Sequence, residues 1–344
     1  MRAVVIDGYG GAERVAVRDV PRPGVQDPHD VVVALKAAAL NRLDLFVVGG
    51  LPGVTHAFPH VLGADGAGVV EAVGAAVTRV QPGDRVLLNP GLSCGRCDFC
   101  LDGEQSLCDT YGILGEHAPG TCGEAIRVPE GNCWPIPDDV TWSDAAAFPL
   151  ATLTAWRMLA TRAKVRPGEL VLIWGIGGGV ALASLAVARL LGARVIVTSG
   201  SDEKLARAKT LGADEGINHR EQDVAKEVRR LTGRRGADVV VDSVGEQTWE
   251  TSTRALARGG RIVTCGGTSG PLVTTDVRRL FWHHWTILGS TMGNHREFGD
   301  IVRLLGRGQL TPVVDRVLPL EEGPAAYARL ATGEQFGKIV LEVS

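Results

Sequence analysis

The sequence predicts an α/β protein in which a doubly wound parallel sheet is joined to a second, β-rich domain. Three observations support this prediction: a strand, glycine turn and helix pattern in 170–191, further strands that alternate with helices after it, and short strands separated by turns on both sides of this region. The 344 residues are enough for two domains with sizeable cores.

The first domain is predicted from short strands and frequent turns up to about Asn132. Arg2–Asp7 and Val15–Val20 are expected to form a hairpin, and Asp30–Ala39 a long strand. A helical pattern over 144–161 marks the boundary. Beyond the sheet, 299–306 is predicted as a helix, and the segments PVVDRVLPL and GKIVLEV as strands that rejoin the first domain. We therefore expect one domain over 1–150 and 291–344, and another over 151–290.

The second domain opens with Leu170–Trp174, an apolar run typical of a strand buried on both faces of a parallel sheet. Glycines follow, and Val180–Leu191 is apolar nearly all round, as in a buried helix. Later strands are predicted at Arg194–Thr198, Asp238–Asp242, Arg261–Cys265 and in the segment WTILGST.

A strand, a glycine turn and a helix N-terminus together can hold a pyrophosphate, because the backbone approaches it closely and presents unpaired N–H groups. Of the dinucleotide pattern G-x-G-x-x-G, two glycines are present and Val180 takes the third place. The alternative is an ordinary glycine-rich turn. Because ligands of such sheets lie at the carboxyl ends of the strands, the expected cofactor-binding residues are Gly175, Gly177, Gly178, Gly179, Val180, Ser199, Ser201, Lys204, Val244, Gly266, Gly267 and Ser290.

The end of the second strand selects the nucleotide. An acid there would bind a ribose 2′-OH, but the sequence has Ser199, with Ser201 and Lys204 just beyond. Two hydroxyls and an ammonium can bind a 2′-phosphate, so we predict NADP(H), with NAD(H) possible. The alternative is that Ser201 only caps the next helix and Lys204 is a solvated helix residue.

The strongest single motif is the set Cys94, Cys97, Cys100 and Cys108, in a lobe over about 91–112. Four thiolates at this spacing predict one structural zinc ion, and they leave no open position for catalysis. Disulfides, free thiols and an iron–sulfur cluster are the alternatives. The remaining cysteines are interpreted as buried thiols.

Six segments carry a resemblance to a known family: GADGAGVVEAVG, PGDRVLLNPG, the cysteine lobe, AAAFPLATLTAW, GIGGGV and GKIVL. Through them the chain resembles the medium-chain dehydrogenase/reductase family over essentially its whole length. The resemblance implies a GroES-like catalytic domain and a Rossmann domain. Zinc-dependent members bind a reactive metal at positions that here hold Asn41, Ala64 and Leu150. The resemblance therefore implies a structural zinc but no catalytic zinc. His56 and His60 lie near these positions in sequence and are interpreted as loop histidines.

The Asn41–Asp44 segment resembles the N-x-x-D run of the quinone-oxidoreductase and enoyl-reductase branch, although Phe46 and Val48 replace a Tyr and an Arg often found there. This resemblance implies an NADPH-dependent reductase of activated C=C bonds, acting on a small-molecule substrate. Asn41 is expected to donate to the substrate oxygen, with Asp44 and Asp65 orienting turns. Thr154 is expected at the nicotinamide, and Lys338 at the pyrophosphate or, alternatively, at the surface.

Two other functions stay open: a zinc alcohol dehydrogenase with unorthodox ligands, and a non-catalytic NADPH-binding protein. Family resemblance implies a homodimer, possibly a homotetramer, paired at the edge strand in 285–291. A net charge of −3 gives no reason to expect nucleic acid or a membrane surface as partner. Without a run of about 20 apolar residues or a signal-peptide pattern, we expect a cytoplasmic protein.

Overall fold

The chain divides at two points, after Ala151 and before Gly293, in a computed structural model that describes residues 1–344. Unit 1 comprises Met1–Ala151 and Gly293–Ser344, and unit 2 comprises Thr152–Met292. These bounds lie within two residues of the domain limits expected from the sequence. None of the helices is both long and apolar enough to cross a membrane.

Unit 1 is organised around a sheet with the strand order β10-β6-β5-β3-β18-β17, in which β9 also pairs with β3. The expected long strand is confirmed as β3 (Asp30–Ala39). The C-terminal strand β18 (Lys338–Glu342) runs antiparallel to β3 and parallel to β17 (Val314–Pro319), so both ends of the chain build one sheet. The other strands are β5 (Asp65–Val73), β6 (Arg85–Leu88), β9 (Ala125–Pro129) and β10 (Cys133–Pro135).

A second sheet of unit 1 has the order β2-β1-β4. The expected hairpin is confirmed by antiparallel pairing of β1 (Arg2–Ile6) with β2 (Val15–Asp19), and β4 (His60–Val61) pairs with the other edge of β1. Short elements complete the N-terminal part of the unit: η1 (Ala12–Arg14), β7 (Gly91–Leu92), α2 (Asp98–Leu101), η2 (Gln105–Leu107), β8 (Gly112–Ile113) and η3 (Glu130–Asn132).

The helices of unit 1 differ in part from those expected. Helix α1 (Arg42–Gly49) has no counterpart in the sequence prediction; its first turn is closed by Asp44, whose Oδ2 accepts from the Asn41 N–H at 2.7 Å. The single helix predicted over 144–161 is divided into three pieces: α3 (Trp142–Ala147), α4 (Pro149–Trp156) and the π-helical η4 (Arg157–Arg162), of which η4 belongs to unit 2. Pro149 accounts for the first division, because it starts α4. The C-terminal part contains α10 (His295–Gly306), η5 (Leu320–Glu322) and α11 (Gly323–Thr332).

Unit 2 contains one parallel sheet with the order β13-β12-β11-β14-β15-β16. The strand order reverses between β11 and β14, the place where doubly wound sheets bind ligands. Five strands were expected and a sixth, β13, was missed, because its sequence EGIN carries a single large apolar side chain. The strands are β11 (Leu170–Ile173), β12 (Arg194–Ser199), β13 (Glu215–Asn218), β14 (Ala237–Val241), β15 (Leu256–Thr264) and β16 (Thr286–Gly289).

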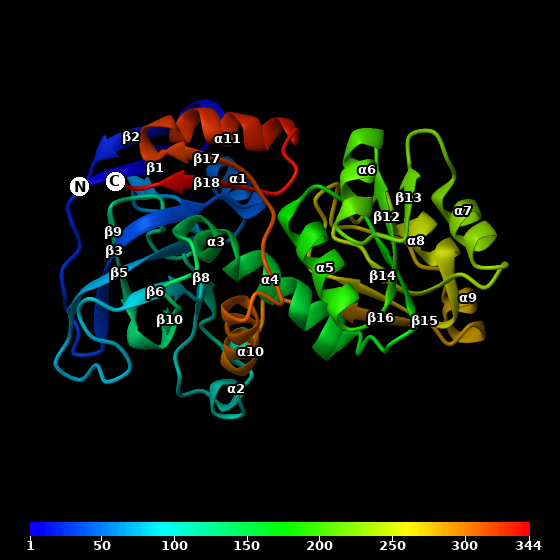
Figure 1. Ribbon diagram of the computed structural model, residues 1–344, viewed down its shortest axis with the longest axis horizontal. Helices are drawn as coiled ribbons and strands as arrows, with labels where there is room; N and C mark the ends of the chain where they lie inside the picture. Colours follow the sequence, from blue (N-terminus) through cyan, green and yellow to red (C-terminus); the bar gives the residue numbers. More distant parts are fainter. The chain divides into compact units, whose positions relative to one another are not determined.

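Helices cover both faces of this sheet, as its fully buried central strands require. In Figure 1, α5 (Gly179–Leu190) and α6 (Asp202–Thr210) lie on one side of it, and α7 (Val224–Leu231), α8 (Trp249–Ala255) and α9 (Val277–Trp282) group on the other. At the end of β14, the buried Asp242 carboxylate accepts from Thr248 and Ser252, and it thereby fixes the turn into α8.

Candidate functional site

The site of unit 1 is a buried polar cluster of Asn41, Asp65 and Lys338, contributed by the segments before α1, at the start of β5 and at the start of β18. Lys338 Nζ donates to Asp65 Oδ2 at 2.7 Å and to Asn41 Oδ1 at 2.5 Å. Asn41 Nδ2 donates to Asp65 Oδ2 at 2.8 Å. The Lys338 and Asp65 side chains are 5% and 0% exposed, so the three groups form a desolvated ion-paired network.

This geometry gives Lys338 a different environment from either sequence interpretation. The surface alternative is wrong, because the residue is buried. Contact with a pyrophosphate stays a prediction, and the ammonium already has two side-chain acceptors within unit 1. Asn41 and Asp65, each expected to have a role at the site, are in direct contact. The pairing with Lys338 was missed because it spans 273 positions of sequence.

The two other positions at which zinc-dependent members bind the reactive metal offer no ligand side chain. Ala64 is fully buried, and Leu150 contributes its backbone N–H to Asp65 Oδ1 at 2.8 Å. With Lys338 and Asn41 on Oδ2, the Asp65 carboxylate therefore has three donors, from β18, from the α1 cap and from the start of α4.

Asp44 lies next to this cluster and is 1% exposed. Burial raises the pKa of its carboxyl to about 7, although the Asn41 N–H and the Lys338 charge oppose the shift. Tyr327 of α11 is fully buried nearby, and its hydroxyl lies 3.7 Å from Cys122 Sγ. The contact of Asp44 with the α1 cap supports the orienting role expected for it.

The two histidines that lie near the expected metal positions in sequence are packed and hydrogen-bonded. His56 and His60 stack with ring centroids 4.1 Å apart, and their Nε2 atoms donate to the backbone oxygens of Glu116 and Gly115. His56 Nδ1 then accepts from the Tyr9 hydroxyl at 3.0 Å. His56 lies in a loop as expected, but His60 belongs to β4.

In unit 2 the glycine turn joins β11 to α5. Gly175 and Gly177 have φ values of +69° and +120°, which favour glycine strongly. A Cβ added at Gly175 would meet nothing within 4 Å, so the turn leaves open space above its backbone. Gly178 is the N-cap of α5, and Gly179 and Val180 form its first turn with free N–H groups. These features fit a bound pyrophosphate.

The end of β12 carries the residues expected to select the nucleotide. Ser199 Oγ accepts from the Ser201 N–H at 3.1 Å, and Ser201 Oγ caps α6 by accepting from the Lys204 N–H at 3.4 Å. The capping alternative is therefore present, and it leaves the remaining lone pair and the proton of the Ser201 hydroxyl for a ligand.

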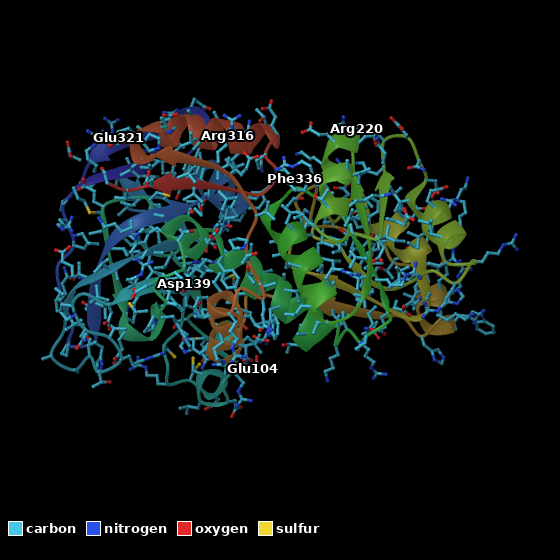
Figure 2. The ribbon with its side chains drawn as sticks, in the orientation of Figure 1. Glu104, Asp139, Arg220, Arg316, Glu321 and Phe336 are labelled. Atoms are coloured by element: carbon cyan, nitrogen blue, oxygen red, sulfur yellow. The ribbon has the colours of Figure 1, made fainter.

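One further residue at this end was missed. Arg220, in the loop after β13, lies over Gly200, since a Cβ added to Gly200 would come within 2.5 Å of its Nε. Figure 2 labels Arg220 near α6. Its guanidinium forms no ion pair, and the Asp202 carboxylate accepts from Asn218 Nδ2 at 2.9 Å. The sequence alone gave no reason to single out Arg220, because its place at this end of the sheet depends on β13, which was not predicted.

The other expected cofactor residues follow strands of the same sheet or lie at the boundary of unit 2. The Val244 N–H donates to Asp242 Oδ1, and Gly266 N–H to Thr264 Oγ1. Gly267 lies against Gly270, where a Cβ would approach within 2.9 Å of a backbone oxygen. Ser290 Oγ is buried without a hydrogen-bond partner, so it is available to a ligand. Thr154 Oγ1 lies 3.6 Å from Met292 Sδ.

The four predicted metal ligands come together in the lobe around α2. The Sγ atoms of Cys94, Cys97, Cys100 and Cys108 all lie within 4.8 Å of one another. A tetrahedral zinc ion with Zn–S bonds of about 2.3 Å requires sulfurs about 3.8 Å apart, so the set fits such an ion. Backbone N–H groups point at two of the sulfurs, from Cys97 to Cys94 and from Cys94 to Cys108. The second contact lowers the pKa of Cys108 to about 6, while burial raises that of Cys100 to about 12.

Comparisons with known proteins agree with this architecture. Residues 27–138 match the family model of the alcohol dehydrogenase GroES-like domain, and residues 179–307 that of zinc-binding dehydrogenases. A crystal structure of an NAD-dependent alcohol dehydrogenase is 49% identical, with a TM-score of 0.95 and full coverage of both chains.

Two further relatives are named for different activities. A zinc-type alcohol dehydrogenase-like protein of Schizosaccharomyces pombe is 32% identical over 100% of this chain and 99% of its own. A quinone oxidoreductase of Rattus norvegicus is 27% identical over 99% of this chain and 97% of its own. The fold and these matches define a two-domain oxidoreductase. The chain belongs to the medium-chain dehydrogenase/reductase family, as its motifs predicted.

Proposed function

We propose that the chain is an NADPH-dependent reductase of activated C=C bonds, such as those of enones, quinones or enoyl thioesters, and that it works without a catalytic zinc. The cluster of Asn41, Asp65 and Lys338 carries this proposal. An ammonium 2.7 Å from Asp65 neutralises the carboxylate that would otherwise attract a metal. Ala64 and Leu150 offer no ligand, and the raised pKa of Asp44 disfavours its anionic form.

A conjugated substrate suits a site without a metal. Bound NADPH would supply a hydride to the β-carbon of such a substrate, and the C=C electron pair would then be carried by an enolate. Hydrogen bonds stabilise the enolate oxygen, and water supplies the proton to the α-carbon. Asn41 Nδ2 supplies one hydrogen bond in this proposal. Its contact with the Ala39 oxygen is long, at 3.4 Å, so the substrate oxygen takes the place of that acceptor.

NADPH is favoured over NADH by the charge at the end of β12. The unpaired guanidinium of Arg220 lies over Gly200. Ser199 and Ser201, which both carry hydroxyl groups, flank Gly200 in the sequence. Guanidinium and hydroxyl donors match a 2′-phosphate. The 49%-identical structure is that of an NAD-dependent enzyme, so NAD(H) is the alternative cofactor.

The second candidate is a zinc alcohol dehydrogenase with unorthodox ligands, which the alcohol dehydrogenases among its relatives favour. It requires a second bound metal, because four cysteine ligands leave the structural ion no position for substrate. The two candidates therefore differ in metal content and in the carbonyl compounds that they reduce.

The test measures zinc per chain after purification without added metal, and NADPH oxidation with cyclohexenone and with cyclohexanone. The proposal expects one zinc and turnover of the enone alone. A Cys100→Ser variant should then contain no zinc. Zinc retained by that variant, together with turnover of the saturated ketone, would establish the alcohol dehydrogenase. Cofactor binding without turnover of either compound would favour a non-catalytic protein.

We also propose a cytoplasmic homodimer paired at β16. This strand bonds only to β15, and Ile287 on it is 40% exposed. The preceding helix α9 exposes Phe281 and Trp282, at 61% and 68%. An apolar edge of this kind needs a cover. Light scattering of the wild type and of an Ile287→Lys variant tests the dimer: the variant should be monomeric, and an unchanged mass would place the interface elsewhere.

A further inference from the structure

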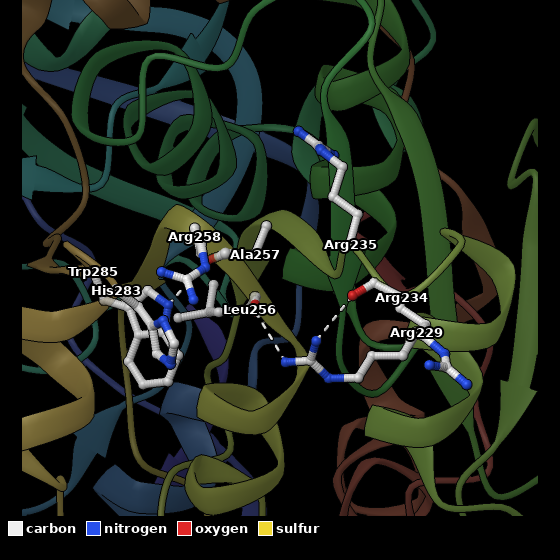
Figure 3. Close-up of a pocket in the computed structure, with 8 residues that line it drawn as sticks. All are labelled: Arg229, Arg234, Arg235, Leu256, Ala257, Arg258, His283 and Trp285. Carbon is white, nitrogen blue, oxygen red and sulfur yellow. Dashed lines mark hydrogen bonds between the residues drawn. The ribbon is translucent and has the colours of Figure 1, made fainter.

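A cavity of about 430 Å³ opens at the edge of the unit 2 sheet where strands β14, β15 and β16 begin. Because the sheet is parallel, this edge is opposite the glycine turn, which follows the carboxyl end of β11. The polar and aromatic lining comprises Arg229, Arg234, Arg235, Arg258, His283 and Trp285 (Figure 3). Four guanidinium groups around one cavity are unusual in a chain whose net charge is −3.

Most of this positive charge has no carboxylate partner. Arg235 is paired with Asp238, and in Figure 3 its side chain points away from Arg258. Arg229 donates to the backbone oxygens of Arg254, Leu256 and Arg234, which are dipoles and not anions. Arg234 and Arg258 form no ion pair. Three of the four guanidinium groups at the cavity, those of Arg229, Arg234 and Arg258, therefore have no carboxylate partner, which leaves an excess of positive charge in its lining.

The inner wall combines this charge with aromatic rings. The Arg258 guanidinium turns toward His283 and Trp285 in Figure 3. The two rings lie 5.1 Å apart, and Trp285 is fixed by donation from its Nε1 to the Ala257 oxygen at 2.9 Å. His283 Nδ1 is buried without a hydrogen-bond partner. Burial and the charges of Arg258, Arg279 and Arg229 lower the pKa of His283, because both disfavour a positive charge on the imidazole.

We propose that this cavity binds a small phosphorylated molecule through its phosphoryl group. Arg258, the remaining Nη1–H of Arg229 and His283 Nδ1 supply donors to the phosphoryl oxygens. A dianion matches guanidinium forks better than a single carboxylate does. Leu256, Ala257 and Trp285 present apolar surface, and a cavity of this size holds an organic group beside the phosphate. The site lies apart from the proposed cofactor site and does not depend on the proposed reaction.

Calorimetric titration of the full chain with phenyl phosphate and with inorganic phosphate, at constant ionic strength, tests this proposal. We expect Arg258→Gln to weaken phenyl phosphate binding at least tenfold. Arg278→Gln is the matched control, since that guanidinium is 88% exposed, pairs with Asp276 and lies outside the cavity. It should change the affinity less than twofold. Arg220→Gln controls for phosphate bound at the nucleotide end of the sheet and should likewise leave this affinity unchanged.

A second readout follows the histidine. Proton NMR should show the pKa of His283 rising when phenyl phosphate binds, because an anion then offsets the surrounding guanidinium charges. Tighter binding of phenyl phosphate than of inorganic phosphate assigns the site to an ester, and equal affinity assigns it to free phosphate. Equal weakening by Arg258→Gln and Arg278→Gln, or an unchanged His283 titration, would overturn the proposal.

Discussion

Replacing Lys338 by methionine isolates the contribution of the buried ion pair, since methionine keeps most of the apolar stem and removes the charge. Asp65 would retain its bonds from Asn41 and from the Leu150 N–H but lose its ammonium. A buried pair that loses one partner typically costs about 3–5 kcal/mol. With exposures of 5% and 0%, Lys338 and Asp65 belong in that range, and we expect Lys338→Met to lower the free energy of unfolding of unit 1 by about 4 kcal/mol.

The assay is native-state hydrogen exchange read by mass spectrometry on peptides from β3, β5 and β18, which share the main sheet of unit 1. Arg18→Met is the control: its ion pair with Asp7 is about half exposed on both sides, and its loss should cost less than about 1 kcal/mol. The double variant Asp65→Asn/Lys338→Met removes both charges and should cost less than either single change. Additive costs of the two single changes would refute the coupling inferred from the structure.

Three further predictions concern the metal lobe, the nucleotide and the acidic group of the α1 cap. Cys100→Ser should lose the bound zinc and unfold at a lower temperature. Cys133→Ser is the control, since this buried thiol lies outside the lobe, and it should keep the metal. If both variants retained the metal, the zinc would be bound at a site other than the four cysteines. Arg220→Gln should raise the KM for NADPH about 10–100-fold, because one charge-assisted hydrogen bond is lost, and it should leave the KM for NADH unchanged. Arg230→Gln is the control and should change neither value. Equal effects of Arg220→Gln on both cofactors, or an effect of the control, would contradict this role. Because the pKa of Asp44 is raised to about 7 in the folded state, its contribution to stability is greatest at low pH and is lost as the pH rises through that value. Relative to Asp44→Asn, the wild type should lose about 3 kcal/mol of stability between pH 5 and pH 8, measured by urea unfolding, and parallel pH profiles would contradict the shift.

The sequence predicted best what depends on local patterns. Apolar runs identified β3 and β11, and glycines after a buried strand identified the turn before α5. The spacing of the cysteines predicted correctly that their four sulfurs lie together, because all four residues belong to one short segment.

Features that depend on long-range contacts were missed. Lys338 was assigned to a phosphate or to the surface, because nothing local shows that β18 lies beside β3 with its ammonium directed at Asp65. Helix α1 was missed because Asn41 was interpreted as a contact to the substrate and Asp44 as orienting a turn, although the two residues close the first turn of this helix. Arg220 was missed together with β13, since its position over Gly200 depends on that strand.

The origin of unit 1 in both ends of the chain sets an order of events during synthesis. Unit 2 is continuous, so all of its strands have been made before β17 and β18 are translated. Until then Ala37–Ala39 of β3 lack the strand that pairs with them, and the Asp65 carboxylate lacks the only ammonium that pairs with it. Domains that fold as units during synthesis generally do so in chain order. In this protein unit 2 is fully synthesised while unit 1 still lacks β17 and β18.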